Sequence, residues 1–515
     1  MGKSRVFRLL SDLNQLKWSV TYKGIIAGLV SGLLVTLYRL GIEFGTEKAI
    51  HLYAFLREHP LYIMPWLLLI AAAGYIVYRL VKLEPYAKGS GIPQVEGIVL
   101  LGMKMKWYSI LAVRFVAGIL ASFFGVSLGR EGPSIQIGAS GSQALAEKIS
   151  KTKVEENYLI TAGASAGLSA AFNAPLSGII FALEEVHRTF SPNILIATTT
   201  AALTADVVSK YFFGLNPVLN FIAIPQLPIK YYFWLLFVGV LSGIMGALTN
   251  KSLLKFGIWY KRLPAFLRPS AALLLALPCG LFIPQVLGGG QSLIRMSEKA
   301  EAGISMLTVY LIVKLLFTCT SFGSGIPGGI FMPILSIGAM TGCIFGQAVT
   351  HLGLPAEYIP AFCVCAMAGV MSGSVKAPIT SILLMAEMTG SLVHLLPVAA
   401  VAFIALLTSD LLKVSPIYEV LLERIADENV TSANAKKRGA LIEISVELGS
   451  PVAGKKVKDV LWPEGTLIVS LCRGKTELVP NGDTQIIQGD YLVVLSSDQR
   501  YAEIHKALIA LCHSD

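Results

Sequence analysis

The order of apolar and polar positions divides the chain into a long first part and a short second part. Through about residue 420, apolar stretches alternate with short breaks rich in glycine, proline and charged residues. About 20 apolar residues are enough to cross a bilayer as a helix. The first part therefore predicts a polytopic α-helical membrane protein. Examples of such stretches are 25–40 with its flanks, 66–81, 232–248 and 395–412.

The part after Leu422 has shorter and more polar alternations. Residues 423–438 are mostly polar and predict a linker. Beyond them, period-two patterns and turn residues predict a small α/β domain over 439–515, too polar to cross a bilayer. The elements predicted in it are strands at 440–447, 466–473 and 484–496, a turn at 481–483 and a helix at 499–512.

The first 17 residues are basic and amphipathic, and no early stretch resembles a cleaved signal. Their apolar positions follow helical spacing. We expect a helix lying on the cytoplasmic face of the membrane, after which the chain enters the bilayer. The apolar positions concerned are Val6, Leu9, Leu10, Leu13 and Leu16.

Composition supports the membrane assignment. The chain is 54% hydrophobic and 14% charged, with a mean hydropathy of +0.66. Soluble domains contain about 25% charged residues. These values exclude a soluble enzyme, and no paired histidines or nucleophile constellation suggest a membrane enzyme.

The net charge of +10 has two readings, nucleic-acid binding or the positive-inside pattern of membrane proteins. The basic residues flank apolar spans, which favours the second reading. We therefore expect no nucleic-acid partner, a location in the cell (inner) membrane and cytoplasmic termini. None of the seven cysteines forms a C-x-x-C pair, so we expect neither a disulfide framework nor a metal site.

The membrane part repeats itself. A pattern Gly-x-x-x-Pro-x-x-x-Ile-Gly-Ala at 129–139 recurs at 329–339, an offset of 200 residues. Further on, Ala-Gly followed by Ala-Pro recurs at an offset near 203, and Glu184 and Glu387 fall in step with it. Two matches in one order imply two structurally related halves. We place these halves at about 20–215 and 230–420.

Gly and Pro interrupt the apolar segments at matching places in both halves, and Gly-Ser-Gly-Ile-Pro occurs at both 89–93 and 323–327. Repeats with interrupted helices are typical of a transport site near the middle of the membrane. A small ion loses hydration energy of order 20 kcal/mol on entering a medium of low dielectric constant. A helix N-terminus offers free N–H groups and about half a positive charge, worth about 0.3–2 kcal/mol, so several must converge on one anion.

Three motifs resemble the signature stretches of CLC chloride channels and transporters. They are Gly-Ser-Gly-Ile-Pro at 89–93, Gly-Arg-Glu-Gly-Pro at 129–133 and Gly-Ile-Phe-x-Pro at 329–333, and they occur in the family's order. The resemblance covers roughly residues 20–420. It implies an inverted repeat of broken, tilted helices in a membrane domain over 1–422, and a homodimer with one anion pathway per subunit.

The resemblance also implies roles for matching residues. Ser90 and Tyr418 would donate their hydroxyls to a central chloride, and Ile330 and Phe331 would donate backbone N–H groups. On local sequence alone, Tyr418 could equally be an aromatic residue of the membrane interface. Further backbone donors near the anion are expected at Gly91, Ile92 and Gly132.

Glu131 is the residue that we expect to gate the pathway. A carboxylate at a helix N-terminus can be a simple cap, but acidic residues at membrane depth are rare and usually functional. By resemblance, the ionised side chain would block an anion site, and the protonated one would swing out and carry a proton. Arg130 would hold structure. The equivalent position in the second half is Phe331, so only the first half has a carboxylate that competes with an anion.

Glu185 matches the position where exchangers of the family carry an internal proton-transfer acid. On sequence alone, Glu184 and Glu185 could be solvated surface charges at a helix end. By resemblance, Glu185 would transfer protons and Glu184 could help water to reach it. The leading hypothesis is thus chloride/proton exchange, with a passive chloride channel as the alternative.

The transported ion and the ligands follow from the same resemblance. Ser90 and Tyr418 favour chloride over nitrate or fluoride, and no cofactor is required. A potassium-transport component is a weaker alternative, because the membrane part lacks a Thr-Val-Gly-Tyr-Gly filter. The expected partners are chloride, protons and the lipid bilayer.

The second part resembles the RCK-C (TrkA-C) domains of potassium channels and transporters. The resemblance covers roughly 438–512 and rests on Gly-Ser-Pro at 449–451, Asn-Gly-Asp at 481–483 and Gly-Asp at 489–490. It implies a cytoplasmic regulatory domain that could dimerise and bind a small ligand, for which a nucleotide such as cyclic di-AMP is the candidate. The same residues are also ordinary turn formers, and none of them identifies a ligand.

Overall fold

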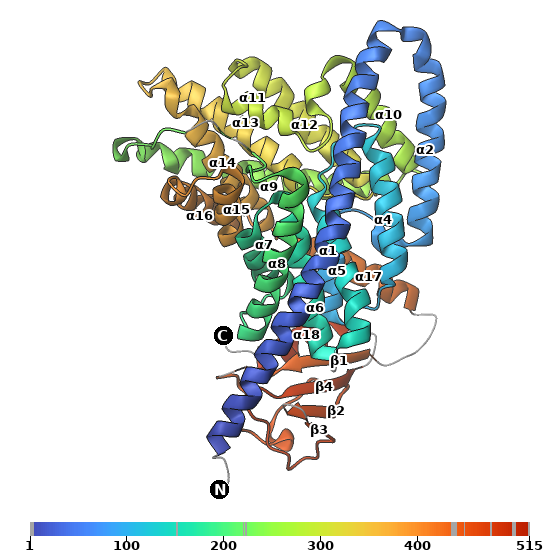
Figure 1. The fold of residues 1–515 in the computed structure, drawn as a ribbon, viewed down its shortest axis with the longest axis vertical. Coiled ribbons are helices and arrows are strands. Elements are labelled where there is room, and N and C mark those ends of the chain that lie inside the picture. Colours follow the sequence, from blue (N-terminus) through green and yellow to red (C-terminus); the bar gives the residue numbers. More distant parts are fainter. Residues whose placement is uncertain are drawn as a thin grey trace. The chain divides into compact units, whose positions relative to one another are not determined.

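The structure is a computed structural model, and it describes residues 5–150, 153–219, 221, 224–433, 440–447, 449–473, 476–496 and 501–512. The chain forms two compact units (Figure 1). The first, here called the membrane unit, comprises Met1–Val99 and Met105–Val420. The second, the tail unit, comprises Leu100–Lys104 and Leu421–Asp515.

The first half of the membrane unit contains eight α-helices, several of them shortened by glycine and proline. The short α7 starts at a proline, which suits the first turn of a helix. The helices are α1 (Arg5–Glu58), α2 (Ile63–Leu83), α3 (Ile92–Leu101), α4 (Trp107–Ser122), α5 (Glu131–Ile149), α6 (Lys153–Phe172), α7 (Pro175–Phe181), followed by the π-turn η3 (Ala182–Val186), and α8 (Pro192–Phe213).

The second half repeats this series. Each helix has its counterpart eight places later, and the same neighbours pack together: α5 on α6 as α13 on α14, and α1 on α8 as α9 on α16. The predicted repeat is thus confirmed. The helices are α9 (Phe233–Lys261), α10 (Leu267–Phe282), α11 (Gln291–Glu298), α12 (Ile304–Gly323), α13 (Phe331–Thr350), α14 (Ile359–Val375), α15 (Pro378–Thr389) and α16 (Leu395–Leu411), and short 3-10 turns are η1 (Pro60–Tyr62), η2 (Pro85–Ala87), η4 (Ile229–Tyr231), η5 (Pro284–Val286) and η6 (Ala356–Tyr358).

A pair of reciprocal hydrogen bonds joins the halves. The N–H of Gly129 donates to the carbonyl of Gly329, and the N–H of Gly329 donates to the carbonyl of Gly129, both at 2.7 Å. Helices α5 and α13 begin two residues after these glycines. Equivalent helix N-termini therefore lie next to each other at the symmetry centre of the fold.

The centre of the membrane unit is packed through small residues. A Cβ at Gly138 would lie 2.3 Å from the carbonyl oxygen of Gly163, and a Cβ at Gly163 would lie 2.4 Å from that of Gly138. Only glycine permits such an approach between α5 and α6, as at other close helix contacts in membranes. Outer helices such as α2 expose large apolar side chains, among them Leu68 and Leu69.

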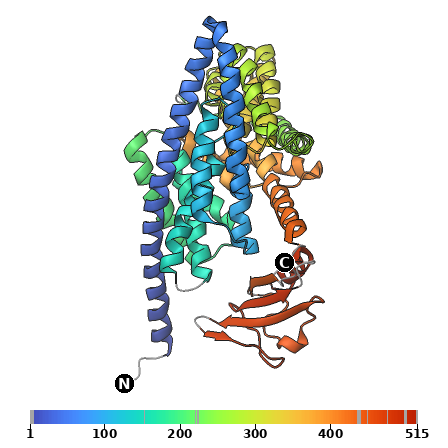
Figure 2. The ribbon, with the colours of Figure 1, turned by 90° about the vertical axis from the view of Figure 1, so that its right-hand side faces the viewer.

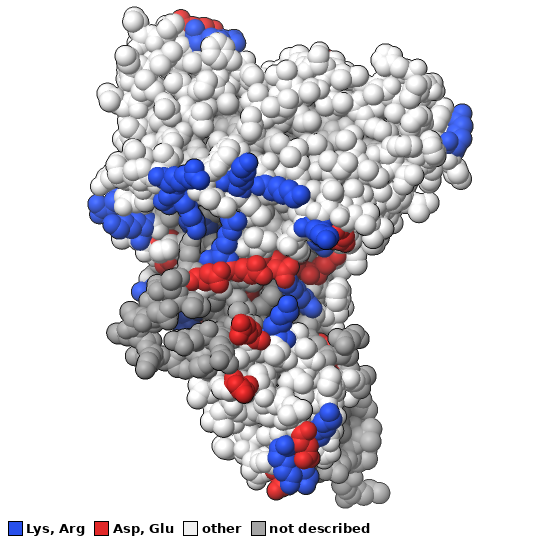
Figure 3. All heavy atoms as spheres, turned by 180° about the vertical axis from the view of Figure 1, so that it is seen from behind, with Lys and Arg blue, Asp and Glu red and all other residues white. Residues whose placement is uncertain are grey.

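This arrangement confirms the predicted polytopic helical fold. Six helices of the described chain are long and apolar enough to cross a bilayer. In Figure 3, large areas of the membrane unit's surface carry no charged side chain, and lysines and arginines gather along the border of one of them. That distribution suits contact with lipid tails next to a polar interface.

The N-terminal segment differs from the prediction. Helix α1 runs without a break from Arg5 to Glu58, so the predicted helix is present from Arg5 onward but continues directly into the following span (Figure 2). No glycine or proline occurs between Arg5 and Lys17, so nothing ends the helix before the membrane span. Its 54 residues span about 80 Å at 1.5 Å per residue, far more than a hydrocarbon core of about 30 Å.

The tail unit contains a four-stranded antiparallel sheet in the order β1-β4-β2-β3. Alternate residues of β4 are buried, and Leu492 and Val494 pack with Ile504 and Leu508 of the following helix. The predicted small α/β domain is confirmed. Its elements are β1 (Ala440–Ser445), η7 (Val457–Asp459), β2 (Thr466–Arg473), β3 (Thr476–Leu478), β4 (Tyr491–Ser496) and α18 (Tyr501–Cys512).

The structure differs from the tail prediction at the start of the last strand, and it shows the secondary structure of the linker. The strand predicted over 484–496 begins only at Tyr491, because Gly489 has a φ of 85° and Asp490 accepts a hydrogen bond from the N–H of Ile487 to close a turn. The predicted linker is helical through Ala433, as the end of α17 (Ile417–Ala433). Polar composition does not distinguish a loop from a solvated helix. The rest of that linker, 434–438, lies outside the described residues.

The residues quoted for the RCK-C resemblance have structural roles. The Arg473 guanidinium donates to both oxygens of the buried Asp490 carboxylate, at 2.9 and 2.8 Å. Hydrogen bonds from Lys458 and Lys456 lower the pKa of Asp483. These contacts account for Gly-Asp and Asn-Gly-Asp as turns that fix the sheet.

Candidate anion and proton pathway

Three helix N-termini meet at the contact between the two halves. Helix α5 begins at Glu131, α13 begins at Phe331, and α3 begins at Ile92 just after Ser90. A Cβ at Gly132 would lie 2.5 Å from the Ser90 Oγ, and a Cβ at Gly329 would lie 2.9 Å from the Gly132 nitrogen. The first N–H groups of a helix have no partner within it. The fold therefore gathers the predicted backbone donors in one place.

Two hydroxyl groups lie beside these helix ends. The Ser90 Oγ and the Tyr418 phenol are both buried and interact with each other, and neither makes a hydrogen bond of ordinary geometry among the described residues. The Tyr418 ring stacks on Phe331, with centroids 6.2 Å apart and an angle of 14°. Buried hydroxyls normally have partners. Two such donors next to three helix ends are suited to binding an anion.

A buried cation holds the loop that carries Ser90. The Arg114 guanidinium on α4 donates to the carbonyls of Gly89 and Ser90, at 2.7 and 3.1 Å. Lys314 is its counterpart on α12 and donates to the carbonyls of Val286 and Gly288. Each cation thus fixes the turn before a short helix, and Arg114 also brings positive charge near the anion site.

Glu131 lies between the helix ends of the two halves. Its side chain is fully buried, and neither carboxylate oxygen makes a hydrogen bond of ordinary geometry within the described structure. The backbone N–H groups of Glu131 and Met332, from the first turns of α5 and α13, face it. A Cβ at Gly129 would lie 2.2 Å from Oε2. The carboxylate thus lies among backbone donors that could equally bind an anion.

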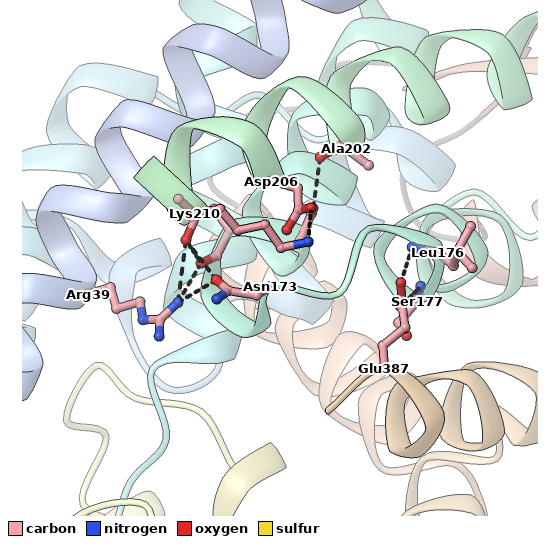
Figure 4. A network of polar contacts seen from close by, with 11 residues as sticks. Arg39, Asn173, Leu176, Ser177, Ala202, Asp206, Lys210 and Glu387 are labelled. Atoms are coloured by element: carbon pink, nitrogen blue, oxygen red, sulfur yellow. Dashed lines mark hydrogen bonds and ion pairs between the residues drawn. The ribbon is translucent and has the colours of Figure 1, made fainter. Parts of the chain in front are cut away.

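A chain of charged and polar groups begins at Arg130, next to Glu131. Arg130 is paired with Glu43 of α1, and Glu43 is also paired with Arg39 at 3.2 Å. The Arg39 guanidinium reaches the Asn173 side chain at 2.8 Å, as Figure 4 shows. Arg130 thus has the structural contact that the sequence predicted for it. Glu43 and Arg39 were not predicted, although charges within an apolar stretch could have indicated them.

Glu185 lies on the π-turn after α7. It is buried, and its Oε1 makes no hydrogen bond among the residues that the structure describes. Glu185 interacts electrostatically with Tyr418, one of the two hydroxyl donors of the candidate anion site. Single π-turns inside helices are frequent at functional sites.

Glu184 contacts the opposite half of the molecule. Its carboxylate accepts hydrogen bonds from the N–H of Thr380 at 2.8 Å, the N–H of Ile379 at 3.2 Å and the Thr380 hydroxyl at 2.7 Å. It therefore caps α15 of the other half. Oε2 accepts two of these hydrogen bonds and Oε1 accepts one, and the predicted help to water stays a prediction.

The comparisons with known proteins agree with this geometry. Residues 67–410, more than half of the chain, match the sequence profile of the voltage gated chloride channel family. The chain is a member of the CLC family. Residues 441–509 match the TrkA-C domain. Both resemblances drawn from the motifs are thereby confirmed.

Individual relatives align with most of the length of this CLC protein. The H(+)/Cl(-) exchange transporter ClcA of Salmonella schwarzengrund is 29% identical over 84% of this chain and 94% of the relative. The ClcA of Salmonella arizonae is 29% identical over 85% and 95%. A slow cyanobacterial Cl−/H+ antiporter of known structure has 28% identity and a TM-score of 0.74, over 79% of this chain and 98% of that one. A CLC-type fluoride/proton antiporter at 23% identity, with a TM-score of 0.65, shares the fold.

One buried acidic residue was not among the predicted site residues. Glu96 on α3 is completely buried, and neither of its carboxylate oxygens makes a hydrogen bond in the described part of the chain. It lies inside the apolar run 92–101. An ionisable residue at membrane depth is a signal of function, so the sequence did contain an indication.

Proposed function

We propose that this protein exchanges chloride for protons across the membrane, with Glu131 as the gate. One observation carries the proposal: the unpaired Glu131 carboxylate lies at the junction of two helix N-termini, beside the hydroxyls of Ser90 and Tyr418. Relatives named H(+)/Cl(-) exchange transporters and a Cl−/H+ antiporter of known structure support it.

Chloride would bind through partial charges. The hydroxyls of Ser90 and Tyr418 and the N–H groups of Ile330 and Phe331 would donate to a central ion, with Gly91, Ile92 and Gly132 as further backbone donors. Each helix end contributes about 0.3–2 kcal/mol. Several such donors together offset dehydration without the tight binding that a full positive charge would cause, so the ion can leave.

The gate would work by competition between two anions. Ionised Glu131 is attracted to the ends of α5 and α13 and blocks the path. A protonated side chain loses that attraction, so chloride displaces it and the carboxyl group takes its proton outward. Glu185 would supply or accept protons from the inner side. Because one side chain serves both ions, their movements are coupled.

The experiment is transport in liposomes. The purified protein is reconstituted, a chloride gradient is imposed without a proton gradient, and the external pH is followed. Protons driven uphill by chloride would establish exchange. Chloride flux without proton movement would overturn the proposal in favour of a passive channel, and potassium flux would favour a potassium-transport role.

We further propose the assembly and placement predicted from the sequence. The protein would be a homodimer in the cell (inner) membrane, with cytoplasmic termini, a transport domain over 1–422 and a regulatory domain over 439–515. The large areas of the membrane unit's surface that carry no charged side chain support contact with lipid (Figure 3). Crosslinking in membranes and labelling of terminal tags from either side test these statements.

The tail unit would regulate transport by binding a small ligand. The TrkA-C match supports the assignment, and α17 provides the link, because it carries Tyr418 in its first turn and continues to Ala433. Cyclic di-AMP is the candidate. Calorimetric titration of the full-length protein tests binding, and flux with and without the nucleotide tests regulation.

A further inference from the structure

The inner side of the pathway contains a second buried carboxyl that the proposed exchange has not used. Glu96 lies on α3, where every side chain from Ile92 to Val99 is buried, and its own exposed fraction is 0%. It is four residues after Ile92, about 6 Å along the helix axis. The helix whose N-terminus faces the anion site therefore also carries Glu96.

Its surroundings supply one weak partner. The only ion pair of Glu96 among the described residues is with Arg188, whose Nη2 lies 3.8 Å from Oε2. That distance is longer than a hydrogen bond. Arg188 is 36% exposed and shared, since its Nη1 lies 3.8 Å from Oε1 of Glu419 and its Nε donates to the Glu185 carbonyl at 3.4 Å.

Three elements place their charged and titratable groups around Glu96. The π-turn η3 contributes Glu185, the residues after it contribute Arg188, and α17 contributes Glu419 and the phenol of Tyr418. With all carboxyls ionised, three negative charges would face one partly solvated cation. Burying an unpaired carboxylate is strongly unfavourable. Like charges at one site also prevent both members of a pair from ionising together.

We propose that Glu96 is a second proton-carrying residue of the inner path, which holds one proton jointly with Glu185. This inference rests on the proposed exchange function. The O–H bond of one carboxyl breaks as the other carboxylate gains the proton, directly or through water, so the charge of the pair is unchanged by the transfer. The pair delivers the proton next to Tyr418 and the anion site, from which it reaches Glu131.

A purely structural role of Glu96 predicts a different effect of substitution. If Glu96 were a permanently neutral packing residue, glutamine, which has the same shape and no titratable proton, would replace it without effect on coupling. If Glu96 carries protons, Glu96→Gln should slow chloride-driven proton uptake by at least about a hundredfold, the smaller end of what proton transfer by a side chain contributes. Chloride flux should stay within a few-fold of the unsubstituted protein.

The controls separate carboxyl chemistry from disturbance of Arg188. Glu419→Gln removes the other carboxylate next to Arg188 but leaves the buried pair, so it should retain coupling. Glu96→Asp keeps a titratable group and should recover part of the proton flux lost in Glu96→Gln. If Glu419→Gln reproduces the loss, or if the aspartate recovers nothing, the proton-carrying role is refuted.

The outcomes are distinguishable from failure of the exchange proposal. If the unsubstituted protein moves no protons uphill, exchange itself fails and the inference falls with it. If that protein couples and Glu96→Gln couples equally well, only the role of Glu96 is overturned. Infrared difference spectra after a pH jump give a readout that does not depend on flux. They should contain a carboxylic acid band that Glu96→Gln removes, and the absence of such a band would also overturn the proposal.

Discussion

Glu184 and Glu387 cap each other's half of the molecule. The Glu184 carboxylate accepts from the backbone N–H groups of Ile379 and Thr380 at the start of α15. The Glu387 carboxylate accepts from those of Leu176 and Ser177 at the start of α7, at 2.9 and 2.7 Å (Figure 4). The two glutamates occupy equivalent positions in the two halves of the sequence, and each makes the equivalent contact with the opposite half.

These caps should matter for stability more than for transport. A hydrogen bond to a charged group contributes about 1.5–3 kcal/mol, and an amide keeps only one acceptor oxygen. We expect Glu184→Gln and Glu387→Gln each to lower the thermal unfolding temperature of the detergent-solubilised protein and to leave the ratio of protons to chloride unchanged. If Glu184→Gln instead reduced proton flux at an unchanged unfolding temperature, the predicted help to water would be right.

Removing the gating carboxyl should uncouple chloride flux from proton flux. In Glu131→Ala, no side chain competes with chloride at the ends of α5 and α13, and none carries a proton. Chloride flux should therefore persist and lose its pH dependence, while chloride-driven proton uptake should vanish. Parallel recordings of chloride efflux and external pH from the same liposomes measure both. Proton pumping by this variant would refute the assignment of Glu131.

Glu185→Val should affect one ion more than the other. The buried carboxyl faces Tyr418, and valine cannot bind a proton, whereas the helix ends that bind chloride remain intact. We expect proton flux to fall much more than chloride flux. An equal loss of both fluxes would mean that Glu185 has a structural role in the π-turn.

Glu43→Gln should change the pH at which the gate opens. Glu43 compensates Arg39 and Arg130, which both lie near Glu131. Without it, uncompensated positive charge stabilises the ionised, blocking form of Glu131, so protonation requires a more acidic external solution. The pH dependence of chloride flux should shift to lower pH, by at most about one unit, equivalent to 1.4 kcal/mol. A shift to higher pH would contradict this account.

Arg114→Met should weaken chloride binding. The carbonyls of Gly89 and Ser90 would lose their donor, and a hydrogen bond to a charged group contributes about 1.5–3 kcal/mol. If the Ser90 loop then moves, we expect at least about a tenfold loss of affinity, which corresponds to 1.4 kcal/mol, in calorimetric titrations with chloride. Lys314→Met is the matched control. It releases the equivalent loop before α11 and should leave chloride affinity unaltered.

Much of the fold and several residues of the candidate site can be predicted from the sequence. The apolar stretches determine that the chain folds in a membrane, because burying them in lipid is the strongest local preference that they have. The repeated glycines and prolines determine two related halves with broken helices. The strand β2 was predicted at its observed bounds, since its apolar pattern and flanking turns are local signals. Three short motifs were enough to name Ser90, Glu131 and Phe331.

Other features were decided only when distant segments met. Glu184 was predicted to help a proton path, yet the fold turns it toward Ile379 and Thr380, almost 200 residues away in sequence. The reciprocal bonds of Gly129 and Gly329 bring together helix ends that no local pattern orients. Glu96 gained its significance from Arg188 and Glu185, which approach it from elsewhere in the chain. The sequence determines which residues can bind charge, but the tertiary structure decides whether each charge finds a partner, because pairing and burial depend on what packs beside it.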